Sequence, residues 1–121
     1  MPDVVERCVE VDAPASDVWE AVIDPERLGE WLNVDVEMDV QPGGAARFIA
    51  PDGTRLLGLV EDVVPERRLA FCWWPSPGFG RTSRVEISLE ETDAHTAVRV
   101  VETFLSVAPP KRPQLRVLAS V

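Results

Sequence analysis

Residues 12–32 read DAPASDVWEAVIDPERLGEWL and carry two short helix signals in immediate succession. Pro14 suits a first helical turn because proline has no backbone N–H to donate, and Asp24 followed by Pro25 supplies a cap residue and a second helix start. Apolar residues recur at spacings of three and four, which is typical of helices with one buried side. The two stripes are Val18, Trp19, Val22 and Ile23, then Leu28, Trp31 and Leu32. We therefore expect a bent pair of helices.

Runs that alternate between apolar and polar residues surround the helix pair, and this is the pattern of half-buried strands. They predict strands over residues 4–11, 34–40, 45–50, 54–64, 69–74, 84–92 and 96–105. Turns rich in Gly, Pro and Asp separate most of them, so we expect an antiparallel meander. Gly58 interrupts the fourth run and indicates a bulge or a close backbone approach, and Glu61 and Asp62 are expected on opposite faces. The pattern predicts a single α+β domain over residues 1–121.

The composition excludes several classes of partner. The 121 residues carry a formal net charge of −9, which argues against nucleic acid or an anionic membrane surface as a partner. No run approaches the roughly 20 apolar residues that a membrane helix needs, and the polar first residues do not predict a signal peptide. Cys8 and Cys72 have no metal or redox spacing, so we expect a cytoplasmic protein with free thiols.

Three motifs in a strand–helix–helix–meander order resemble the START-like superfamily of polyketide cyclases and lipid-transport proteins. They are DAPASDVWEAVIDPERLGEW (residues 12–31), QPGGAARF (residues 41–48) and LVEDVVPERRLAFCWW (residues 59–74). Within this superfamily the chain is most similar to the branch named after the activator of the heat-shock-protein-90 ATPase. The similarity extends over roughly residues 4–104.

The resemblance implies a helix-grip fold, in which a curved antiparallel sheet holds a long C-terminal helix over an apolar cavity. This chain departs from that pattern, because only residues 114–121 remain after Phe104 to form a shortened helix. An exposed apolar sheet face is a liability in a monomer, so we also expect a homodimer that buries this face or uses the C-terminal segment.

The residues offer little catalytic chemistry. The only histidine, His95, is placed at a hairpin tip, where a solvated turn residue is expected. No Ser/His/Asp arrangement can be assembled, and no metal ligands occur at a usual spacing. The sequence therefore predicts no catalytic residue, no metal and no cofactor.

Aromatic residues give the stronger signal. Period-two alternation places Phe71 and Trp73 on one face of their strand, where Phe48 would join them. An aromatic-lined cleft with few polar groups is how small apolar ligands are held, although the same rings would also suit an ordinary core. The predicted binding residues are Trp31, Phe48, Phe71, Trp73, Leu89, Val100 and Glu102.

Two of these residues have alternative interpretations. Glu102 shares a strand face with Val100, and a carboxylate among apolar neighbours is costly to bury unless it is paired or its pKa rises. It is either a polar anchor in the pocket or a residue at a frayed strand end. Arg47 or Arg99 could be its partner, although alternation puts Arg99 on the opposite face of the strand. Trp31 ends the second helix and belongs either to the core or to the pocket rim.

We therefore predict a domain that binds a hydrophobic or aromatic small molecule, lipids included, without turning it over. One alternative is a polyketide cyclase- or dehydratase-like enzyme with Glu102 as general acid or base. Another is a co-chaperone-like or stress-related interaction module that uses the open sheet face. The superfamily hosts many functions, so fold alone does not choose among them.

Overall fold

The structure is a computed structural model that describes residues 4–76 and 82–105. Its elements are β1 (Val4–Val11), α1 (Ala15–Val22), α2 (Pro25–Leu32), β2 (Asp35–Met38), β3 (Ala45–Ile49), β4 (Arg55–Val64), β5 (Arg68–Pro75), β6 (Ser83–Thr92) and β7 (His95–Phe104). The predicted C-terminal helix at residues 114–121 lies outside the described residues.

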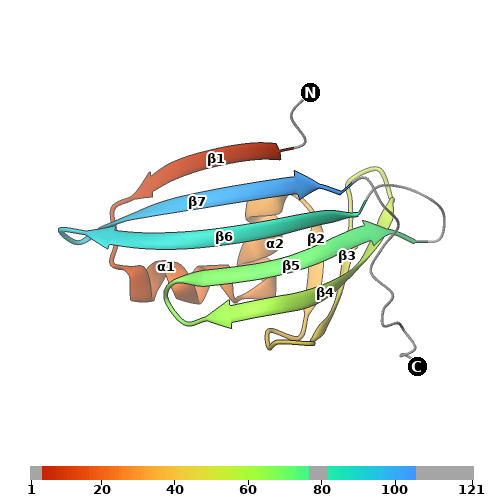
Figure 1. The fold of residues 1–121 in the computed structure, drawn as a ribbon, viewed down its shortest axis with the longest axis horizontal. Coiled ribbons are helices and arrows are strands. Elements are labelled where there is room, and N and C mark those ends of the chain that lie inside the picture. Colours follow the sequence, from red (N-terminus) through yellow and green to blue (C-terminus); the bar gives the residue numbers. More distant parts are fainter. Residues whose placement is uncertain (1–3, 77–81, 106–121) are drawn as a thin grey trace.

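The strands form one antiparallel sheet in the order β1-β7-β6-β5-β4-β3-β2. β1 and β2 therefore lie at opposite edges, although only the helix pair separates them in the sequence. Figure 1 shows α1 and α2 on one side of the sheet, which curves so that β2 and β3 come round beside α2. This curved antiparallel sheet with two helices after the first strand confirms the predicted helix-grip α+β class.

The helix pair forms where the sequence predicted it, and each helix has an identifiable start. Asp24 caps α2 by accepting a hydrogen bond from the backbone N–H of Glu26 at 3.0 Å, and Pro25 occupies the first turn. Asn33 ends α2 in the left-handed conformation, with φ of 59°. The first backbone N–H of α1 is satisfied from a distant strand, because Ala15 donates to the carboxylate of Glu91 at 2.8 Å.

The sheet has two faces, named here by what covers them. The helix face contacts α1 and α2, and the outer face is the opposite side. Residues directly opposite each other on antiparallel strands share a face of the sheet. Phe71 pairs with Val85, and the residues paired with them on the flanking strands continue the same face. Together they form a continuous apolar surface under the helices. The buried members of this core are Val18, Trp19, Val22, Leu28, Ala46, Phe48, Val60, Leu69, Phe71, Val85, Ile87, Leu89 and Val98.

A bulge in β4 explains the irregular hydrophobic pattern of that strand. Val60 pairs with Phe71 and Asp62 pairs with Ala70, so Glu61 is the extra residue. Glu61 and Asp62 consequently both lie on the outer face, and the prediction that they lie on opposite faces is wrong.

Gly58 provides the close backbone approach that the sequence also indicated. A Cβ at this position would lie 2.8 Å from Cε2 of Phe48 and 2.9 Å from the carbonyl oxygen of Cys72. The missing side chain of Gly58 therefore makes room for the Phe48 ring on the helix face.

Candidate ligand-binding site

Three aromatic rings from β3 and β5 meet on the helix face. The ring centroids of Phe48 and Phe71 are 5.4 Å apart in a stacked arrangement, and Trp73 meets them edge-on at 4.8 Å and 5.5 Å. Such offset and edge-to-face contacts are favourable for aromatic quadrupoles. Phe48 and Phe71 are fully buried, whereas Trp73 is half-buried. Trp73 is therefore the accessible member of the cluster, and the two phenylalanines support it from below.

Glu102 lies beside this cluster and is held by it. The indole Nε1–H of Trp73 donates a hydrogen bond to Oε2 of Glu102 at 3.1 Å. Trp73 belongs to β5 and Glu102 to β7, so the bond spans β6. Hydrogen bonds to an ionised acceptor are stronger than neutral ones, which fixes the orientation of this half-buried carboxylate.

Neither of the arginines expected as partners of Glu102 reaches it. Arg47 bonds to Glu37 at 2.7 Å, and Arg99 bonds to Glu6 of the neighbouring strand. Both pairs lie on the outer face, because the strand alternation that points Glu102 toward the helices points these arginines away. The expectation of an arginine partner from β3 or from β7 is therefore wrong, and an indole takes its place.

Beside Glu102, the helix face is left uncovered toward β1. The register pairs Val5 with Glu102, Arg7 with Val100 and Val9 with Val98, so these β1 side chains share the helix face. Val5 is 44% exposed and Val9 is 54% exposed, because α1 and α2 cover other parts of the sheet. This apolar strip, formed by Val5, Val9 and the half-buried Val100, is called the open floor below. Sequence analysis missed its β1 members, since the strand pairing that brings them here is not visible in the sequence.

The remaining predicted residues occupy different environments. Leu89 is 8% exposed and packs in the core, next to Val98 on the neighbouring strand. Trp31 is 43% exposed on α2, and it takes no part in the ring contacts found among the described residues. The structure thus brings Phe48, Phe71, Trp73 and Glu102 together and leaves Trp31 apart from them.

Two cavities lie near the other edge of the sheet. The smaller has a volume of about 650 Å³ and reaches the helix face at Val36, Phe48 and Leu56. The larger, of about 1000 Å³, lies between α2 and the β2–β3 edge, and four acidic residues, Asp24, Glu26, Glu30 and Asp35, are among those that line it. Of the predicted binding residues, only Phe48 lines either cavity. An apolar ligand is better matched by the open floor than by the acidic cavity.

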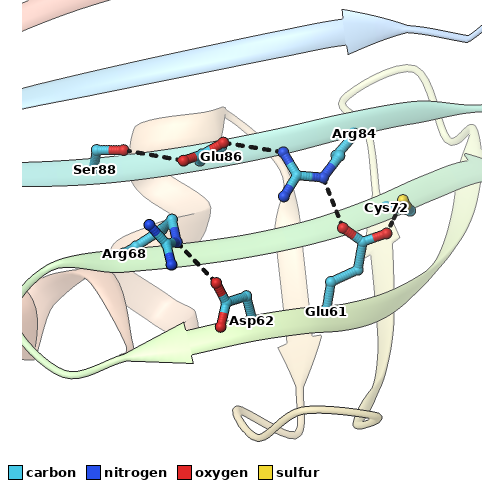
Figure 2. Close-up of polar contacts among 7 residues, drawn as sticks. All are labelled: Glu61, Asp62, Arg68, Cys72, Arg84, Glu86 and Ser88. Atoms are coloured by element: carbon cyan, nitrogen blue, oxygen red, sulfur yellow. Dashed lines mark hydrogen bonds and ion pairs between the residues drawn. The ribbon is translucent and has the colours of Figure 1, made fainter.

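The outer face carries a separate polar cluster, shown in Figure 2. The thiol of Cys72 donates to Oε2 of Glu61 at 2.9 Å, and Arg84 bridges Glu61 and Glu86 at 2.7 Å and 3.0 Å. Burial of Cys72, together with the hydrogen bond to Glu61 and its charge, raises the pKa of the thiol from 9.0 to about 12. Because the thiolate is the reactive form, this cysteine is a poor nucleophile and has a structural role.

The described residues offer no other obvious reactive centre. Within residues 4–76 and 82–105, no three side chains of His, Cys, Asp or Glu come together as metal ligands would. His95 forms an exposed pair with Asp12 at 3.3 Å, at the corner where β1 meets α1. In the same part of the chain, neither α1 nor α2 is long and apolar enough to cross a membrane.

Solved structures share this fold. DynU16, a protein in the dynemicin biosynthetic locus, matches with a TM-score of 0.75 at 28% identity, covering 99% of this chain and 44% of that chain. CalU16 from Micromonospora echinospora matches with a TM-score of 0.66 at 26% identity, covering 85% and 61%. CV1439 from Chromobacterium violaceum, at 22% identity and a TM-score of 0.71, covers 92% and 86% and shows the fold alone.

Sequence comparison adds a curated relative and a family. An uncharacterized protein of Schizosaccharomyces pombe is 22% identical over 94 residues, covering 74% of this chain and 26% of that protein. The chain thus spans about a quarter of the length of this curated relative. The model of the family described as activator of Hsp90 ATPase homolog 1-like protein matches residues 12–116. This match covers most of the chain, which therefore belongs to the activator of Hsp90 ATPase homolog 1-like family, within the START-like superfamily.

Proposed function

We propose that the protein binds a hydrophobic or aromatic small molecule on the open floor, without turning it over. The single observation that carries this proposal is the exposure of Val5 directly opposite Glu102, the hydrogen-bond partner of Trp73, with the exposed Val9 further along the same face. Apolar side chains on the core-facing side of a sheet are normally covered, and here Val5 lies beside a carboxylate whose indole partner is itself only half-buried.

The energetics are adequate for a small ligand. Burying about 200 Å² of apolar surface contributes roughly 5 kcal/mol at 25 cal/mol per Å², before the cost of immobilising the ligand is subtracted. A flat molecule over Trp73 and Val100 would also gain the edge-to-face or stacking contacts that aromatic rings favour. Because about 5–6 kcal/mol corresponds to a dissociation constant of roughly 0.1 mM, affinities in the submillimolar range or weaker are expected for a ligand of two fused rings.

Glu102 would orient the ligand. Trp73 holds one carboxylate oxygen, Oε2, and no described residue bonds to the other. A hydroxyl or amine on the ligand would complete the hydrogen bonds of this carboxylate. A purely binding role is supported by the setting, because histidine, the commonest general acid or base, does not lie beside Glu102. The one histidine of the chain, His95, pairs with Asp12 at the opposite end of β7.

A titration with a neutral environment-sensitive dye, phenylnaphthylamine, tests this proposal. We expect saturable binding to the wild type and at least a tenfold weaker affinity for Val5→Gln, which makes the open floor polar beside Glu102. Leu59→Gln is the matched control, because Leu59 is 39% exposed on the outer face. Ile49 lines both cavities, so Ile49→Gln tests whether the dye binds in a cavity and not on the open floor.

Two outcomes contradict the proposal. One is the absence of saturable binding to the folded wild type. The other is a loss of affinity in Leu59→Gln or Ile49→Gln that equals or exceeds the loss in Val5→Gln, since the dye would then bind elsewhere.

A further inference from the structure

Arg7 is the cation of the open floor. It lies in the middle of β1, directly opposite Val100, and its neighbours on the same face of the strand are Val5 and Val9. The side chain is exposed, and it forms no ion pair within the part of the chain that the structure describes. A guanidinium placed between two valines on the face that meets the core is unusual for a solvated surface residue.

The other arginines show how unusual this position is. Of the seven others within residues 4–76 and 82–105, five pair with a carboxylate, and these are Arg27, Arg47, Arg68, Arg84 and Arg99. Arg55 and Arg67 have no such partner among residues 4–76 and 82–105, but they lie at a strand start and in the β4–β5 turn. The chain has 21 acidic and 12 basic residues, so carboxylates are plentiful. Arg7 on the helix face nevertheless has no ion-pair partner among the described residues, which favours a ligand as its partner.

The nearest carboxylate on the same face, Glu102, is directed away from Arg7. Glu102 lies on β7, next to β1, but its carboxylate reaches across β6 to the indole of Trp73. The register places Glu102 opposite Val5, so it lies diagonally from Arg7 on the neighbouring strand, and no ion pair joins the two within the part of the chain that the structure describes. The open floor thus carries a cation on β1 and, on β7, an acceptor whose Oε2 is held by Trp73.

From this arrangement, which rests on the proposed function, we infer that the ligand is a hydrophobic carboxylic acid whose carboxylate binds Arg7. The planar guanidinium offers paired N–H donors that match the two oxygens of a carboxylate. The apolar body lies over Val5, Val100 and Trp73, and a hydroxyl at the far end donates to Glu102. The net negative charge of the protein repels an anion at long range, but this repulsion is screened beyond about 8 Å at physiological ionic strength. The strength of the contact between the ligand carboxylate and Arg7 is therefore determined by the groups close to Arg7.

Matched naphthalene probes test the inference by isothermal titration calorimetry. Naphthoic acid and naphthamide have the same ring and nearly the same shape, but only the acid is an anion at neutral pH. We expect the wild type to bind the acid about tenfold more tightly than the amide, which is the effect of one charge-assisted bidentate contact. In Arg7→Gln this preference should fall to about twofold or less. Arg67→Gln removes the same charge from the β4–β5 turn and should keep the preference.

Each result separates the inference from the proposed function. Equal binding of acid and amide by the wild type, or an unchanged preference in Arg7→Gln, overturns the inference and leaves the binding function standing. Failure of both probes and of naphthol to bind the wild type overturns the proposed function as well. Because Arg7 is exposed on an edge strand, both glutamine variants should fold, and circular dichroism verifies this.

Discussion

Trp73 and Glu102 are joined by a hydrogen bond of 3.1 Å that passes over a whole strand, from β5 to β7. The bond gives the indole two roles, since the same ring packs edge-on against Phe48 and Phe71. It also holds a carboxylate on the core side of the sheet without an arginine. This carboxylate lies on β7 and the guanidinium of Arg7 on β1, so the open floor carries two opposite charges on neighbouring strands.

Removal of the indole donor alone should destabilise the fold. Trp73→Phe keeps a ring against Phe48, and we expect the free energy of unfolding to fall by about 1–2 kcal/mol because the Glu102 carboxylate loses its partner. Urea denaturation followed by circular dichroism measures this change. Trp31→Phe alters an exposed ring and should stay within about 0.5 kcal/mol of the wild type. Equal losses in the two variants would show that the hydrogen bond contributes nothing.

Gly58→Ala should be more harmful than an ordinary glycine replacement in a strand. The added methyl group would lie 2.8 Å from the Phe48 ring and 2.9 Å from the carbonyl oxygen of Cys72, and the backbone oxygen cannot move freely. We expect a loss of about 1–3 kcal/mol in the free energy of unfolding, the usual range for overpacking. Gly43→Asn is the control, because Gly43 has φ of 84° with open space around it and asparagine tolerates this conformation. A neutral Gly58→Ala would contradict the packing described here.

The stability of the protein should decline at alkaline pH in a way that depends on Cys72. The pKa of its thiol is 9.0 ordinarily and about 12 in the fold, because of burial and of the Glu61 contact. Between these values the unfolded chain releases the proton and the folded chain keeps it, so stability falls as pH rises. Thermal denaturation from neutral pH to about pH 10 should show a shallower decline for Cys72→Ala than for the wild type. Parallel declines would rule out this linkage.

The two cysteines should react differently with thiol reagents. Cys8 is exposed on β1 and Cys72 is buried on β5. At about pH 8 we expect the native protein to be labelled at Cys8 only, and the second equivalent to react after denaturation, since Cys72 is held as the thiol. Peptide mapping by mass spectrometry identifies the site. Rapid labelling of Cys72 in the native state would indicate that the Glu61 contact opens.

Glu91 should act as a remote cap of α1. Its carboxylate accepts the backbone N–H of Ala15 at 2.8 Å, at the positive end of the helix dipole. We expect Glu91→Ala to lower the free energy of unfolding by about 1 kcal/mol, as the loss of an N-cap does. Glu90→Ala, the neighbouring exposed position on the outer face, serves as the control and should change little. If both variants have the same stability, the cap has no energetic role.

Much of the architecture follows from local patterns. The Asp24–Pro25 pair and the apolar stripes specify the two helices, and alternation alone places Phe71 and Trp73 on one face. The same alternation, carried over the strand 96–105, puts Glu102 near these rings. These predictions succeed because a period of 2 or 3.6 determines which side chains share a surface.

Other features depend on contacts that no local pattern encodes. The bulge at Glu61 shifts the register of β4 by one residue, which a period of two cannot anticipate. The partner of Glu102 is an indole two strands away, although charge alone suggested an arginine. The sequence does not reveal the ligand-binding role that we infer for Arg7, because this role depends on the pairing of β1 with β7, the two strands most distant in the sequence.

The neighbourhood of β1 and β7 also has a consequence for synthesis on the ribosome. β1 emerges first, but its hydrogen-bonding partner is the last of the described strands to be made. Closure of so long a loop delays this pairing, and a strand rich in valine must meanwhile remain solvated. Glu6, Arg7 and Glu10 interrupt its valines with charges, which is how nascent strands are kept from aggregating. The residue that we assign to ligand recognition thus also protects the unfinished polypeptide.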